Sequence, residues 1–212
     1  MKRVFGVLCM LVVAGAATAA PPQKGSTLFA LQIGETATDL VDLESGGYLT
    51  SANFVAHPDL TVSAQLWHFL TNDYAVSLGG GIGFFSETDK PGSNAPPASP
   101  DLKYTQSSWR VRLGGDRWGT ISDRFQVFAG PGIQVSGGKW KFDDGTTTTT
   151  SQNTTVFALE GRIGAHLRCG DRAGIVMQLG HYIGYASASS NGAKTHWWAS
   201  GHDGSAGLAI TF

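Results

Sequence analysis

The sequence ends in Gly201–Phe212, which reads G-H-D-G-S-A-G-L-A-I-T-F. From residue 206 onward every second residue is apolar, and the residues between them are small or polar. The apolar positions are Ala206, Leu208, Ile210 and Phe212. A period of two is typical of a β-strand with two different faces and not of a helix. The chain therefore ends in an amphipathic strand whose last residue is aromatic.

The same alternation recurs in seven earlier segments. One face of each segment carries mainly Leu, Ile, Val and Phe, and the other carries Gln, Arg, Glu, Ser, Thr and Gly. The predicted strands are residues 26–40, 60–70, 74–84, 104–115, 125–137, 156–168, 175–185 and 197–212. The links between them alternate in length. Long loops are predicted at 42–53, 86–100, 139–153 and 188–195, and short turns at 71–73, 116–123 and 169–172.

Alternating long and short links distinguish two all-β architectures. A soluble β-sandwich has no reason to place every long loop at one end, whereas an outer-membrane barrel does so. Lipid leaves no partner for an open sheet edge, so the first strand must pair with the last. Aromatic residues near strand ends would form the two interfacial girdles, namely Tyr74, Phe84, Phe125, Tyr185, Trp198 and Phe212. The sequence predicts an all-β fold, a transmembrane antiparallel up-and-down eight-stranded β-barrel over residues 20–212.

The amino terminus predicts export. Lys2 and Arg3 precede an apolar stretch at 4–17, and an A-x-A cleavage site follows at 17–19. This pattern is typical of a signal peptide, and we expect cleavage after Ala19. Removing the two basic residues from the 15 Lys and Arg leaves 13 against 16 acidic residues, a net charge of about −3 that predicts no nucleic-acid partner. Cys9 leaves with the signal, so Cys169 has no intramolecular disulfide partner.

Two residues interrupt the alternation. Glu35 falls on the apolar side of the first strand, which predicts either that the strand has left the hydrocarbon or that a bulge shifts its register. Pro131 lies inside the fifth strand although proline cannot donate to a ladder, and a bulge between Gly130 and Gly132 would accommodate it.

The stretch Gln65–Val76 reads Q-L-W-H-F-L-T-N-D-Y-A-V. It is similar to the second hairpin of bacterial outer-membrane β-barrel domains, where an aromatic pair precedes a Thr-Asp/Asn turn. Nearly the whole mature chain resembles the small eight-stranded proteins of the OmpA-transmembrane and OmpX-like superfamily. The resemblance implies a monomer in the cell outer membrane, with outer-membrane lipid and lipopolysaccharide as partners. It also implies that the assembly machinery reads the closing strand, here through Leu208, Ile210 and Phe212.

The inward faces predict a polar network. An eight-stranded barrel is just wide enough for side chains to fill it, and buried charges must be paired. The predicted interior residues are Arg110, Arg112, Gln134, Glu160, Arg162, His166, Gln178, Tyr182 and Asp203. We favour a structural role for this network. The alternative is a small gated channel that uses the internal Arg and Glu residues.

Two histidines fall on the lipid face. Strict alternation places His181 and His202 outward on neighbouring strands. We expect them either near the outer rim of the barrel or in a local bulge. This arrangement resembles lipid A deacylases, barrels with a His/Ser pair on the outer wall. In those enzymes Ser follows the His by two residues, and here that position is Ile183. A lipid A-modifying enzyme is therefore the weakest alternative, and no catalytic, cofactor-binding or metal-binding residue is predicted.

The four long loops are rich in Gly, Ser, Thr, Asn and Pro. Loops of this kind are where small barrels contact surfaces and other molecules. The threonine run at 146–150 is prone to β-structure and predicts that the strands flanking it protrude as a hairpin. We therefore predict an envelope structural or surface-interaction protein, with an extracellular ligand at its loops.

Overall fold

A computed structural model describes residues 23–41, 59–90, 101–143, 145–150, 153–190 and 193–212. The predicted signal peptide and the predicted loop at 42–53 lie outside these residues, so both stay predictions. No helix that is long and apolar enough to cross a membrane occurs in the described part of the chain.

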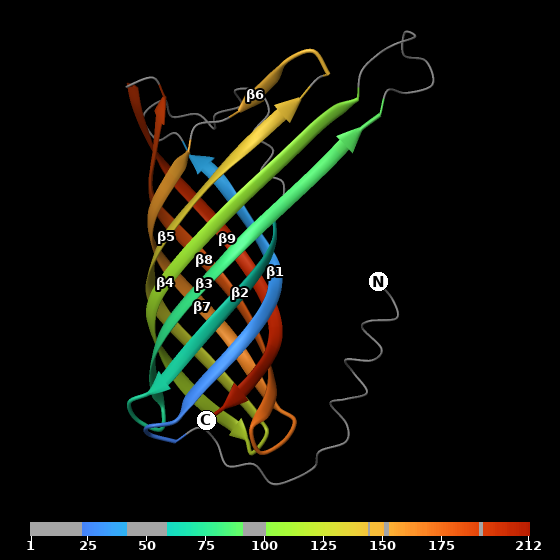
Figure 1. Cartoon of the computed structure of the whole chain (residues 1–212). Helices are drawn as coiled ribbons and strands as arrows, with labels where there is room; N and C mark the ends of the chain where they lie inside the picture. The colour runs from blue at the N-terminus through green and yellow to red at the C-terminus, as the bar shows by residue number, and fades with distance from the viewer. Residues whose placement is uncertain (1–22, 42–58, 91–100, 144, 151–152, 191–192) are drawn as a thin grey trace.

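The described residues form nine antiparallel strands, eight of which make a barrel (Figure 1). The short strand β6 lies outside the ring and pairs only with β5. The strands are β1 Thr27–Val41, β2 Asp59–Phe69, β3 Tyr74–Asp89, β4 Leu102–Ser122, β5 Phe125–Asp143, β6 Thr148–Thr150, β7 Thr154–Arg168, β8 Ala173–Ser190 and β9 Ala193–Thr211. This confirms the predicted eight-stranded up-and-down barrel.

The ring closes where the first strand meets the last. β1 pairs with β9 from Leu28 opposite Thr211 to Val41 opposite Trp198. Two backbone hydrogen bonds lock the end of this seam: Phe212 N donates to Thr27 O at 2.8 Å, and Thr27 N donates to Phe212 O at 3.1 Å. Both chain ends of the barrel lie beside the short turns, so we call this end the turn end and the opposite end the loop end.

Alternation along each strand separates two faces, as predicted. Outward Leu31, Leu159 and Leu179 are 56%, 63% and 62% exposed, whereas the neighbouring inward residues Gln32, Ala158 and Gln178 are almost fully buried. The outer wall is therefore a continuous apolar surface, and the inner side chains fill the barrel.

β4 differs most from its prediction. The short turn predicted at 116–123 is wrong, because β4 continues to Ser122 and turns only at residues 123–124. The glycines before Asp116 do not end the strand, and Gly115 has a packing role: a Cβ there would lie 2.3 Å from the hydroxyl oxygen of Tyr74. The glycine leaves space for this ring, and the strand goes on through Asp116 and Trp118.

The loop end also differs from its prediction. β8 extends to Ser190 and β9 begins at Ala193, so most of the long loop predicted at 188–195 is strand, and residues 191–192 lie outside the described residues. β5 extends to Asp143, and the threonine run supplies β6, which confirms a protruding hairpin. The sheet of β3, β4, β5 and β6 projects on one side of the loop end, and the ends of β8 and β9 rise on the other side (Figure 1).

Neither predicted bulge occurs. β1 pairs residue for residue with β2 and β9 through Glu35, opposite Leu60 and Gly204. β5 pairs with β7 in one register through Pro131, opposite Gly161. The β4–β5 ladder has no pairs at Gly130 and Pro131, where the proline has no N–H to donate, and then resumes in the same register. A gap in one ladder replaces the bulge.

The barrel interior has three layers. At the turn end Trp67, Phe69, Trp118 and Phe128 pack together, with the Trp118 and Phe128 rings stacked at 4.6 Å between centroids. At the loop end Tyr182 packs with small residues and Trp197. Charged and amide side chains fill the middle layer. The turn-end aromatic cluster was not predicted, and it closes the barrel below the polar layer.

Candidate functional site

Three ion pairs cross the middle layer of the barrel. They join Arg110 to Asp203, Arg112 to Glu160, and Arg162 to Asp116. All six side chains are buried, and they come from strands β4, β7 and β9. The three positive charges match three negative charges one to one. A buried charge is tolerated only when it is paired and hydrogen-bonded, so each pair depends on both of its members.

Asp116 is the most heavily bonded acid of this layer. Arg162 Nε donates to Asp116 Oδ1 at 2.7 Å, and Arg162 Nη2 also bonds Oδ2. Trp67 Nε1 donates to the same Oδ2 at 3.0 Å, and the Arg162 guanidinium lies 5.7 Å from the centre of the Trp67 ring. A bidentate guanidinium–carboxylate pair is strong and geometrically specific. Asp116 therefore ties β2, β4 and β7 together.

Glycines make room for this layer. A Cβ at Gly180 would lie 2.4 Å from Asp203 Oδ1 and 2.7 Å from Glu160 Oε1. A Cβ at Gly79 would lie 2.9 Å from the stem of Arg112. The inward glycines of β3 and β8 thus provide the space into which long charged side chains reach.

Amide side chains continue the polar layer towards the turn end. Gln178 Nε2 donates to Gln32 Oε1 at 3.0 Å and to Ser205 Oγ at 3.2 Å, and the Gln65 amide lies 3.2 Å from the same nitrogen. His166 Nδ1 lies 3.1 Å from Gln126 Oε1. The contacts of Gln178 with Gln32 and Gln65 join strands that are far apart in the sequence, whereas the other two contacts join neighbouring strands.

All nine residues expected inside the barrel are buried. Asp116 was missed, and with it the correct charge balance, because only Glu160 and Asp203 were counted as inward acids. The signal was present: alternation from Arg110 and Arg112 points Asp116 and Trp118 inward if the strand is simply continued. Gln32, Gln65 and Gln126 also join the network although they were not among the expected residues.

The two outward histidines are direct partners. His181 lies opposite His202 in the β8–β9 ladder, whose register is continuous, so the bulge considered for them is absent. They lie below the outer girdle, since Tyr185 and Trp198 pair two rows nearer the loop end. Ile183, where a deacylase would carry Ser, lies opposite Ser200. Among the described residues no group of three His, Cys, Asp or Glu could hold a metal ion.

The remaining predicted residues lie at the turn end. Leu208, Ile210 and Phe212 are exposed on the outer wall of the closing strand. Their use as an assembly signal stays a prediction. Cys169, in the turn after β7, is a free thiol whose pKa is raised by burial.

Solved structures with the same architecture are outer-membrane proteins. Ail, the attachment invasion locus protein of Yersinia pestis, matches with a TM-score of 0.53 and 10% identity over 90% of this chain and 100% of that chain. OprG from Pseudomonas aeruginosa matches with a TM-score of 0.55 and 12% identity over 92% and 98%. AlkL, solved in lipid bilayers, matches with a TM-score of 0.51 and 14% identity over 92% and 94%.

At these identities the similarity shows the fold alone. Comparisons with models of protein families and with curated protein sequences find no match. The chain has the fold of the small eight-stranded outer-membrane β-barrel proteins, as its sequence predicted.

Proposed function

We propose that this protein is a structural barrel of the bacterial outer membrane that contacts polyanions at the cell surface through its projecting sheet. In this orientation the turn end is periplasmic and the loop end is extracellular. The apolar outer wall supports insertion in lipid, because exposed Leu, Ile, Val and Phe side chains surround the barrel.

The observation that carries the surface role is a ladder of lysines on the projecting sheet. Lys139, Lys141 and Lys103 are exposed on β4 and β5, on the face that continues the lipid-facing wall. Trp109, an outward aromatic residue, lies opposite Gly137, and Lys139, Lys141 and Lys103 follow in the next three rows towards the loop end. Phe84, a predicted girdle residue, lies in the row of Lys139. This position supports contact of the lysines with outer-leaflet phosphates.

Charge on the same face favours an anionic partner. Asp143, an acid of this face that lies opposite Lys103, accepts hydrogen bonds from Gly145 N at 3.0 Å and Thr148 Oγ1 at 3.3 Å. Glu87 and Asp89 lie at alternate positions of β3, on the opposite face of the sheet. Phosphate groups of lipopolysaccharide are the polyanions nearest to this surface. Ail has been solved with the heparin analogue sucrose octasulfate, which makes a sulfated sugar the second probe to test.

A triple variant Lys103→Gln, Lys139→Gln, Lys141→Gln tests the proposal. Each lysine near an anionic surface contributes about 1 kcal/mol, so we expect lipopolysaccharide affinity to fall by about 100-fold at low salt. The measurement is titration of the folded protein in detergent with purified lipopolysaccharide and, separately, with heparin. Lys24→Gln, at the turn end, is the matched control. A triple variant that binds both probes as tightly as Lys24→Gln would refute the surface role.

The gated channel remains a second candidate because charged pairs lie across the lumen. The turn-end aromatic cluster closes the barrel below these pairs, so we expect the wild-type protein to show no conductance steps in planar bilayers. Steps that Glu160→Ala and Arg162→Ala alter would establish the channel instead.

A further inference from the structure

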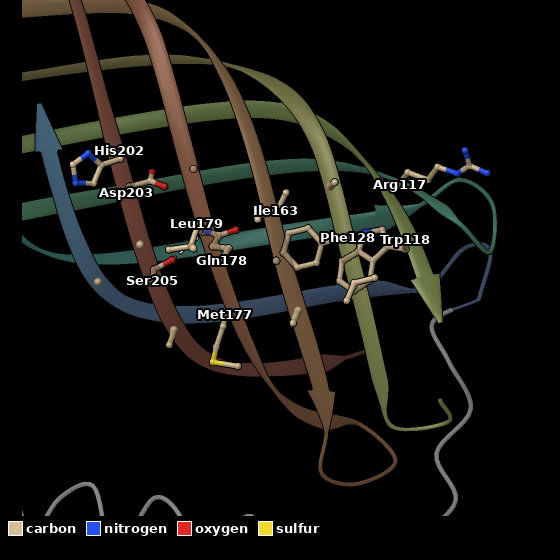
Figure 2. A pocket seen from close by; sticks show the side chains of 18 of the residues that line it. Arg117, Trp118, Phe128, Ile163, Met177, Gln178, Leu179, His202, Asp203 and Ser205 are labelled. Carbon is tan, nitrogen blue, oxygen red and sulfur yellow. Dashed lines mark hydrogen bonds between the residues drawn. The ribbon is translucent and has the colours of Figure 1, made fainter. Parts of the chain in front are cut away.

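A groove of about 1430 Å³ lies on the outer wall of the barrel (Figure 2). Outward side chains line it, among them Ile33, Val127, Ile163, Met177 and Leu179. Inward residues of the same strands line it as well, namely Trp118, Phe128, Gln178, Asp203 and Ser205, whereas the arginines of the ion pairs do not. The outward side chains give this hollow an apolar face towards the membrane.

The strand register explains the hollow. Two adjacent rows of outward residues cross the sheet from β4 to β9. The first row is Arg117, Ala129, Ile163, Leu179 and Gly204, and the second is Gly119, Val127, Ala165, Met177 and Ala206. Five of these ten residues are Gly or Ala. The small residues form the floor of the groove, and the larger residues of the same rows form its sides. On β2 and β3 the outward positions instead carry large residues such as Val62, Leu66, Leu78 and Ile82.

Arg117 marks one end of the groove and His202 the other (Figure 2). Arg117 is exposed and lies opposite Tyr74, an outward aromatic residue 43% exposed at the start of β3. Trp118 N donates to Asp73 O of the adjacent short turn at 2.8 Å. Arg117 therefore lies at the membrane interface of the turn end. We find no hydrogen bond or ion pair of its side chain among the described residues.

We propose that this groove binds a glycerophospholipid of the periplasmic leaflet, with its phosphate at Arg117 and one acyl chain along the rows of small residues. Arginine matches phosphate in geometry and charge. Each row rises by about one residue per strand towards the loop end, so a chain that starts at Arg117 runs into the hydrocarbon.

The dimensions agree with one acyl chain. Neighbouring strands lie about 4.8 Å apart, so the three steps from β4 to β8 cover about 14 Å. An acyl chain that crosses one leaflet spans about half of a hydrocarbon core that is about 30 Å thick, so it is long enough to follow this path. A chain anchored at Arg117 therefore reaches β8, the strand before the polar His202 on β9.

Native mass spectrometry of the protein in mild detergent tests this site with two probes, phosphatidylglycerol and diacylglycerol, which lacks the phosphate. Ala165→Trp fills the groove, and Arg117→Gln removes the charge. Ala64→Trp places the same ring at an outward alanine of β2, which does not line the groove. The gel shift between boiled and unboiled samples shows that each variant has folded.

We expect the wild type and Ala64→Trp to retain one phosphatidylglycerol. Ala165→Trp should lower its retention about tenfold, and Arg117→Gln, which loses a charge-assisted contact, by a similar factor. Diacylglycerol should bind more weakly and be insensitive to Arg117→Gln. Equal retention by Ala165→Trp and Ala64→Trp, or equal binding of the two probes by the wild type, would overturn the proposal. So would retention of lipopolysaccharide in place of phospholipid. The lysine variant of the projecting sheet should leave this binding unchanged, so the two proposals fail separately.

Discussion

Asp116→Ala is expected to lower the free energy of unfolding by about 3–5 kcal/mol, the usual cost of removing one partner of a buried ion pair. The substitution leaves the Arg162 guanidinium buried without its carboxylate, with the neutral side chains of Ser77 and Gln65 beside it. It also removes the acceptor of the Trp67 indole. The measurement is an unfolding titration with urea of the protein in lipid vesicles. The folded fraction at each urea concentration is the intensity of the fast-migrating band on unboiled gels.

Two further variants separate charge from packing. Asp101→Ala removes an exposed carboxylate, and its effect should stay within about 0.5 kcal/mol. The double variant Asp116→Leu, Arg162→Met removes both charges and should recover most of the lost stability, because apolar residues of similar volume often replace a buried pair without loss. Equal stability of Asp116→Ala and Asp101→Ala would show that the pair does not hold the barrel together.

The strand faces could be predicted because lipid and a narrow interior impose one rule on every strand. A side chain points either into hydrocarbon or into a space that admits few atoms, so alternation is strict along β2, β7 and β8. This explains why the orientation of Glu160, Arg162 and His166 follows from their positions alone. It also explains why His181 and His202 face outward in spite of their polarity.

The ends of the strands could not be predicted, because outside the hydrocarbon that rule no longer applies. Small residues at 188–195 fit a loop as well as a strand, and the structure continues β8 and β9 through most of them. At the turn end the fourth strand was predicted to stop at residue 115, whereas β4 continues and Gly115 provides the space for the Tyr74 ring. That contact joins residues of two strands and has no local signal in the sequence.

The partners within the interior also depend on the fold. Alternation shows that Arg110, Arg112 and Arg162 point inward, but it does not show which acid each one meets. Arg110 of β4 pairs with Asp203 of β9, and β3, β2 and β1 separate these two strands in the sheet order. Ending the fourth strand too early removed Asp116 from the count and left one arginine without its acid. The extent of a strand thus decides whether the interior charges balance.

Gly207→Val is expected to prevent closure of the barrel. A Cβ at Gly207 would lie 1.8 Å from Leu31 O and 2.6 Å from Gln32 Cα, so the β1 backbone would have to move away. Gly207 pairs with Gln32 in the middle of the β1–β9 seam. Opening this seam leaves backbone groups without partners in lipid, where each one costs several kcal/mol. We expect no folded band on unboiled gels after refolding into vesicles.

Gly161→Val is the matched control for this variant. Gly161 is also a strand glycine with a partner on each side, but a Cβ there meets nothing within 4 Å and points to the membrane. This variant should refold with the yield of the wild type. Both substitutions replace a glycine that weakens a strand by a valine that favours one, so these two effects are the same in both variants. The difference between the variants therefore reports the close approach of the two backbones. A folded band for Gly207→Val at wild-type yield would mean that β1 and β9 do not approach as closely as the structure shows. The seam would then tolerate side chains, and the glycines along it would need another explanation.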